Sequence, residues 1–157
     1  MSSTVAVLSP SDLLAHWQGH RRLTRRVIEA FPEESLHSFS VGGMRPFAAL
    51  AGEMLAIAVP MLREIVSGEA ATYNEAVPAS KAELLAAWDA ATSELDAWFA
   101  KLPSDKFGET LTVFGQFTGP VWSHLAYAID NEIHHRAQGY VYLRALGIEP
   151  PAFWQRD

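Results

Sequence analysis

The sequence contains no cysteine, which excludes disulfide bonds, thiolate-bound zinc and cysteine nucleophiles. Basic residues are also few: twelve Lys and Arg stand against eighteen Asp and Glu, for a formal net charge of -6. Because no sustained basic cluster offsets this charge, we expect no nucleic-acid partner. No uninterrupted apolar run reaches about 18 residues, and the first residues lack the basic stretch of a secretory signal. We therefore expect a cytoplasmic protein that does not interact with membranes.

What the chain does contain is typical of one globular domain. Its 157 residues are 49% hydrophobic and 19% charged, and a chain of this length usually forms a single core. Four segments show apolar residues at helical spacing and carry their own start and stop residues. These predicted helices cover residues 10–31, 46–67, 80–102 and 119–146. The fold predicted for residues 1–157 is all-α, a four-helix bundle with two longer connections at residues 32–45 and 103–118.

The second of these connections contains the one strand-like stretch. Residues 110–114, with the sequence Thr-Leu-Thr-Val-Phe, favour a β-strand locally. A single strand without a pairing partner is not stable, and no partner is evident elsewhere in the chain. The prediction for residues 104–118 is therefore an ordered loop.

Glu53 is the only charged residue between Arg45 and Arg63, in a predicted helix that is apolar on nearly all sides. An isolated buried carboxylate is costly unless it is paired, protonated or bound to metal. On a helical wheel, however, Glu53 lies well away from the centre of the apolar stripe. Two interpretations stay open: a solvent-facing or ion-paired residue, and a functional carboxylate at a seam between helices.

The last predicted helix carries polar residues within its apolar stripe. His124, Asn131 and His135 share one face, and Asn131 and His135 are one turn apart, a spacing that lets two side chains address one ion. Glu132 and His135 also form a Glu-x-x-His pair of the kind found in di-iron bundles. None of the other three predicted helices carries a second copy of that pair, which argues against a di-iron centre.

Other polar and aromatic residues favour structural interpretations. His20, on the apolar face of the first predicted helix, is typical of a hydrogen-bonded core histidine. Arg21, Arg22, Arg25 and Arg26 are typical of a solvated helix face. Phe153 and Trp154 would either close one end of the bundle or contribute to a two-fold interface.

The run from Asp130 to Gln138, with the sequence Asp-Asn-Glu-Ile-His-His-Arg-Ala-Gln, resembles the last helix of the DinB/YfiT-like superfamily. The following Tyr142-Leu143-Arg144-Ala145-Leu146-Gly147 is similar to the ending of that helix in the family, and Met44-Arg45-Pro46 is similar to the entry into its second helix. The resemblance covers essentially the whole chain and implies the same four-helix order.

The resemblance also implies a divalent metal ion, often zinc or nickel, held by three histidines. One comes from the second helix, and two, four residues apart, come from the last. In this sequence those positions fall on Glu53, Asn131 and His135, so only one histidine is kept. His20 and His124 are further candidate contributors. Family members with assigned activities are thiol-dependent transferases and isomerases that use a thiol such as bacillithiol or mycothiol, and the resemblance implies a homodimer.

Two functional hypotheses follow. In the first, Glu53, Asn131 and His135 surround a divalent ion whose open position activates water or a low-molecular-weight thiol, in an S-transferase or a hydrolase acting on a small molecule. In the second, the chain has lost the metal and serves as a small-molecule-binding or dimeric interaction module. Glu53 would then accept a hydrogen bond from His135 across the core.

Overall fold

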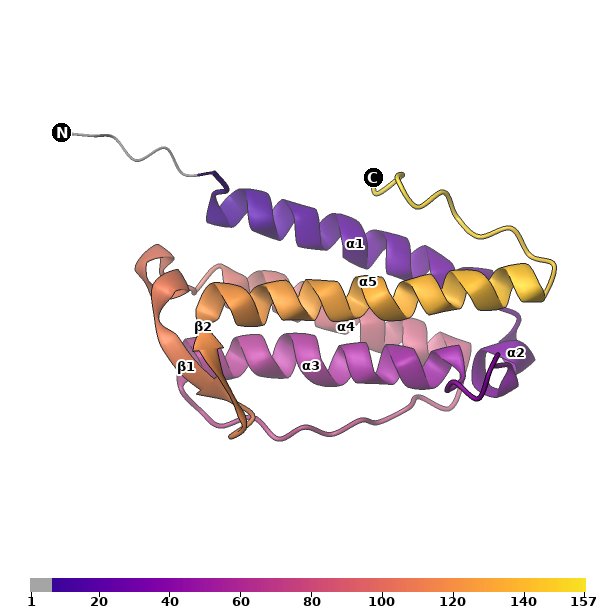
Figure 1. Cartoon of the computed structure of the whole chain (residues 1–157), viewed down its shortest axis with the longest axis horizontal. Coiled ribbons are helices and arrows are strands. Elements are labelled where there is room, and N and C mark those ends of the chain that lie inside the picture. Colours follow the sequence, from indigo (N-terminus) through magenta and orange to yellow (C-terminus); the bar gives the residue numbers. More distant parts are fainter. Residues whose placement is uncertain (1–6) are drawn as a thin grey trace.

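The computed structural model describes residues 7–157, which form a bundle of four long helices with a short hairpin at one end (Figure 1). In chain order the elements are α1 (Pro10–Ala30), α2 (Glu33–Ser38), α3 (Phe47–Ser67), α4 (Lys81–Phe99), the 3-10 helix η1 (Ser104–Gly108), β1 (Thr110–Val113), β2 (Phe117–Pro120) and α5 (Val121–Ala145). The four-helix bundle predicted from the sequence is thus confirmed, and the four long helices match the predicted segments. The six-residue helix α2 lies inside a connection for which no helix was predicted.

The helix ends follow from local chemistry. Ser9 caps α1 by accepting a hydrogen bond from the backbone N–H of Asp12, and the Asp12 carboxylate accepts one from the N–H of Ser9. The Ser80 hydroxyl caps α4 by accepting a hydrogen bond from the N–H of Glu83, whereas the Glu83 carboxylate accepts one from the N–H of Ala79. Gly68 ends α3 with φ at 76°, in the left-handed region that favours glycine.

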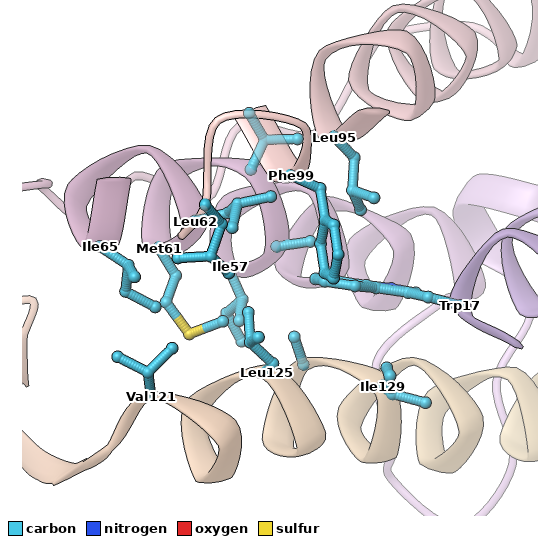
Figure 2. Close-up of a cluster of buried hydrophobic side chains, with 14 of the residues drawn as sticks. Trp17, Ile57, Met61, Leu62, Ile65, Leu95, Phe99, Val121, Leu125 and Ile129 are labelled. Carbon is cyan, nitrogen blue, oxygen red and sulfur yellow. The ribbon is translucent and has the colours of Figure 1, made fainter. Parts of the chain in front are cut away.

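Helix α3 lies between α4 and α5, and α1 packs on the other side of the same two helices. Helix α2 and strand β1 also pack against α3, and this cover on several sides explains why α3 is apolar on nearly all sides. Near the hairpin end, side chains from α1, α3, α4 and α5 form one cluster of buried hydrophobic residues (Figure 2). In it, Trp17 of α1 lies beside Phe99 and Leu95 of α4, and Met61 lies close to Leu125 of α5. A second cluster fills the opposite end, where Phe31 and Phe47 stack with ring centroids 4.8 Å apart.

The prediction of an ordered loop at residues 104–118 is wrong in one respect. Thr110–Val113 does have a pairing partner, the antiparallel strand Phe117–Pro120, with Thr112 opposite Thr118. The partner was missed because Gly119 and Pro120 were interpreted as the beginning of the last helix. The hairpin lies at the end of the bundle beside α3 and α5 (Figure 1).

Arg21 also differs from its predicted place on a solvated face. Its side chain is fully buried between α1 and α4, with the guanidinium 3.6 Å above the Trp88 ring and a hydrogen bond from Nη2 to the Trp88 carbonyl oxygen. Arg25, in contrast, is partly exposed and pairs with Glu29 and Asp89.

None of the helices formed by residues 7–157 combines the length and apolar character that crossing a membrane requires.

Candidate functional site

Glu53 lies in the first half of α3, on the side that faces α5, and its side chain is only 17% exposed. Two groups of α5 reach the same oxygen. Asn131 donates from Nδ2 to Glu53 Oε1 over 3.0 Å, and His135 Nε2 lies 3.0 Å from that Oε1. Asn131 and His135 are both 8% exposed. The structure therefore brings together the acid, the amide and the imidazole that the sequence analysis placed at the family's three ligand positions.

The second carboxylate oxygen of Glu53 is held by Arg45, which precedes α3 and forms an ion pair with Oε2. Arg45 also donates from Nη1 to Glu75 over 2.8 Å, and Glu75 accepts a hydrogen bond from the Tyr73 hydroxyl. Burial by itself raises the pKa of Glu53, but hydrogen bonds from Arg45, His135 and Asn131 outweigh it and bring the pKa to about 2. Glu53 is thus held as a carboxylate at neutral pH.

The His135 ring faces an oxygen on each side. Its Nδ1 lies 2.6 Å from Oε1 of Gln138, one helical turn further along α5, while Nε2 faces Glu53. The Gln138 amide nitrogen points to the sulfur of Met44, at 3.1 Å, which fixes the carbonyl oxygen toward the imidazole. A neutral imidazole carries a single N–H and can donate to only one of these oxygens. Either Nε2 donates to Glu53, or Nδ1 donates to Gln138 and a bound cation would lie between Nε2 and the Glu53 carboxylate.

The donor set can be compared with what a divalent ion requires. Glu53 Oε1 and His135 Nε2, the two stronger donors, would be the main ligands of such an ion, and they lie 3.0 Å apart, which is also an ordinary hydrogen-bond distance. The Gln138 contact to Nδ1 is the outer hydrogen bond that metal-binding histidines usually make. Asn131 would supply Oδ1, the one buried amide oxygen here without a hydrogen-bond partner, after a half-turn of its side chain.

This donor set is weaker than three imidazoles. No group of three His, Cys, Asp or Glu side chains within residues 7–157 is placed to hold a metal ion. The Arg45 guanidinium also lies against the same carboxylate and competes for its charge. The three residues fit a divalent ion as one strong oxygen ligand, one strong nitrogen ligand and one weak amide ligand.

A cavity of about 550 Å³ opens beside Glu53, between α3, α5 and the hairpin. It lies within the size range of small-molecule sites. Glu53 is the only Asp, Glu, Lys or Arg among its lining residues from the described part of the chain. The remaining walls are Ile57, Met61, Tyr73, Val113, Phe114, Gln116, Phe117, Thr118, Gly119, Ser123, His124 and Tyr127.

The two further candidate ligands have other contacts. His124 lines this cavity, and its Nε2 lies 3.1 Å from the carbonyl oxygen of Leu111 in β1. His20 packs between α1 and α5, where its Nδ1 accepts from Arg136 Nη2 over 2.9 Å. Burial, together with the charges of Arg136, Arg156 and His16, lowers the pKa of His20 to about 3. The hydrogen bonds of His20 and His124 do not include Glu53, Asn131 or His135.

Residues flanking the site were not found as functional candidates from the sequence. Gln138 could have been found, because it lies three residues after His135 on the same helical face. Glu75 and Tyr73 could not, because they belong to the connection between α3 and α4 and reach the site only through the tertiary fold. That connection passes along α3 (Figure 1), where Gly52 allows the Ala76 carbonyl oxygen to approach closely.

Comparison with known proteins identifies the family and the fold. The family model described as "DinB family" matches residues 1–156. A DinB-like protein of Bacillus cereus superposes with a TM-score of 0.74 at 18% identity, covering 90% of this chain and 95% of that chain. A DinB-like protein of Bacillus subtilis gives a TM-score of 0.72 at 18% identity, covering 92% of this chain and 99% of that chain. No curated protein matches the chain. The match over nearly the whole sequence and the shared fold establish that this chain belongs to the DinB family.

Proposed function

We propose that the protein holds a divalent metal ion between Glu53, His135 and Asn131 and binds a small molecule in the adjoining cavity. The observation that carries this proposal is the environment of His135, whose two ring nitrogens both face oxygen atoms. A cation between Nε2 and Glu53 Oε1 leaves the ring neutral and satisfies both contacts. Zinc and nickel are the ions that the family suggests.

Such an ion would supply Lewis-acid chemistry, lowering the pKa of a bound water or low-molecular-weight thiol for a hydrolase or an S-transferase reaction. The chain's own residues prepare the site. Gln138 orients the imidazole through Nδ1, and Arg45 keeps Glu53 ionised through Oε2. The apolar walls of the cavity limit access of bulk water to the reacting centre.

The test is metal analysis of protein purified without an affinity tag, before and after incubation with zinc or nickel. We expect close to one ion per chain, and at least a tenfold loss of affinity in His135→Ala and in Glu53→Ala. Asn131→His should strengthen binding, because an imidazole replaces a weak amide ligand. His134→Ala is the matched control, since His134 is the exposed neighbour of His135. A stoichiometry well below one that neither substitution changes would remove the proposal.

A metal-free alternative is favoured by a different observation. Arg45 occupies Glu53 Oε2, and Asn131 and His135 can both donate to Oε1, so the carboxylate is satisfied without a metal ion. The chain would then be a small-molecule-binding or dimeric interaction module built on an ion-paired core. In EDTA, a double-mutant cycle of Glu53→Gln and His135→Ala should give a coupling energy of about 1–3 kcal/mol. Additive losses would exclude the direct pair.

A further inference from the structure

Phe114 has an unusual backbone conformation in the wall of the cavity beside Glu53. It is the only non-glycine residue with positive φ in the described part of the chain, at 52°, and it is followed by Gly115 at 65°. Together with the hydrogen bond from Gln116 N–H to the Val113 carbonyl oxygen, these angles form a type I′ turn. Asparagine is the residue usually preferred at the first of these positions, and a bulky aromatic residue is strained there.

The surrounding structure holds this strained residue in place. The backbone N–H of Phe114 donates to Glu64 Oε2 of α3 over 2.8 Å. The ring contributes to the cavity wall and meets Tyr73 edge to face, with centroids 6.3 Å apart. A strained conformation that is stabilised from a neighbouring helix, and that directs an aromatic ring to a cavity, points to a role in binding.

The mouth of the cavity is also aromatic. Tyr73, Phe117 and Tyr127 line it, and they are 46%, 59% and 56% exposed. Exposed aromatic side chains gathered around one opening are typical of a binding site and lower the solubility of the free protein if they bind nothing. The hairpin contributes Phe114 and Phe117, and α5 contributes Tyr127, so both elements form part of this rim.

The charge of the walls excludes one class of ligand. Among residues 7–157 no Lys or Arg lines the cavity, and the one Asp or Glu that does is Glu53. Arg45, the nearest guanidinium to that carboxylate, is already paired with Glu53 and Glu75. In the metal-free protein, a ligand carrying a phosphate, sulfonate or carboxylate would enter without a cation to neutralise it, which is unfavourable in an apolar environment.

We propose that the cavity binds an uncharged aromatic molecule, whose ring packs against Phe114 and Tyr73, and discriminates against anionic molecules of the same shape. In this proposal Phe114 determines the specificity, and Glu64 holds it in position by accepting the hydrogen bond from its backbone N–H. The inference rests on the proposed function only in placing the small molecule in the same cavity, because the aromatic contacts do not require a metal ion.

The test uses two fluorescent probes that share one skeleton, neutral N-phenyl-1-naphthylamine and its sulfonated relative 8-anilino-1-naphthalenesulfonate. Titrations with folded, EDTA-treated protein should show saturable binding of the neutral probe at one molecule per chain. The sulfonated probe should bind at least tenfold more weakly. No saturable binding of the neutral probe, or equal or tighter binding of the sulfonated one, would overturn the proposal.

Two substitutions separate binding from folding. Phe114→Asn should lower the affinity for the neutral probe at least tenfold. The melting temperature of this variant should stay unchanged or rise, because asparagine adopts this backbone conformation more readily. Ser123→Phe, which fills the cavity from α5, should also lower the affinity for the neutral probe. Phe153→Asn is the matched control, because Phe153 is exposed but does not line the cavity. This variant should bind the neutral probe with the same affinity as the parent protein. Unchanged affinity in both cavity variants would refute the role of Phe114.

The probe titrations test this inference whether or not the protein binds a metal ion at Glu53. Metal content is measured on the same preparations before EDTA treatment. A chain that binds the neutral probe but no metal would overturn only the proposed function, and a chain that binds metal but not the probe would overturn only this inference.

Discussion

At the scale of single residues, α5 places two polar networks on opposite flanks. Asn131 and His135 turn toward Glu53 of α3, while their neighbours Glu132 and Arg136 turn toward α1. On the α1 side, Glu132 is only 2% exposed and accepts a 2.6 Å hydrogen bond from the Thr24 hydroxyl. One helical turn thus serves both the candidate site and a buried structural cluster.

Glu132 is the single carboxylate between two buried guanidinium groups. Its oxygens lie 3.8 Å from Arg21 and 3.9 Å from Arg136. Glu132→Gln should therefore lower the free energy of unfolding by about 3–5 kcal/mol, because it leaves two buried cations without a counter-charge. Chemical denaturation at neutral pH measures this loss.

The same substitution at an exposed pair provides the control. Glu29 pairs with Arg25 one turn away on the surface of α1, and Glu29→Gln should change the free energy of unfolding by no more than about 0.5 kcal/mol. Equal effects at the two positions would show that the Glu132 cluster contributes no more than a surface pair.

At the scale of whole elements, the close approach of α3 and α5 depends on a glycine. A Cβ atom added to Gly139 would lie 2.5 Å from Cε2 of Phe47. The Phe47 ring cannot move away easily, because it is fully buried and stacks on Phe31. The separation of these two helices in turn sets the distance between Glu53 and His135.

Gly139→Ala should therefore destabilise the protein by about 1–3 kcal/mol, although alanine is the better helix former. It should also weaken binding at the Glu53 site, because the helices move apart. Thermal unfolding measures the first effect, and metal or probe titration the second. Gly108→Ala is the control: no atom lies within 4 Å of its added Cβ, so the change should stay within about 0.5 kcal/mol.

At the scale of the whole molecule, a buried histidine couples stability to pH. The pKa of His20 is lowered to about 3 by burial and by Arg136, Arg156 and His16, whereas in the unfolded chain it is near 6.5. Between these two values the unfolded state binds a proton that the folded state excludes, so stability falls as the pH falls. The contribution of His20 is fully present above about pH 6.5 and is lost progressively toward pH 3.

His20→Asn tests this coupling, because an amide oxygen can accept the hydrogen bond from Arg136 and does not titrate. We expect the slope of unfolding free energy against pH, measured from pH 6.5 to pH 4, to decrease by up to about 1.4 kcal/mol per pH unit. His16→Asn, at the exposed neighbour of His20, should leave the slope nearly unchanged. Identical slopes in the parent and His20→Asn would contradict the assignment.

The sequence by itself determined the four long helices, since capping residues, prolines and helical periodicity act over a few neighbouring residues. It also singled out Glu53, Asn131 and His135, because polar residues stand out within apolar stripes. The pairing of β1 with β2 was missed, because Phe-Gly is not a common turn sequence and Gly119-Pro120 also begins a helix.

Only the tertiary structure decided which charges meet. Arg21 follows the pattern of a surface residue, yet α4 covers it, and Glu132 reaches it from the other end of the chain. Tyr73 and Glu75 reach the Glu53 site through a connection whose path depends on its packing against α3. Such contacts join residues distant in sequence, and their geometry is set by how the helices pack rather than by any local pattern.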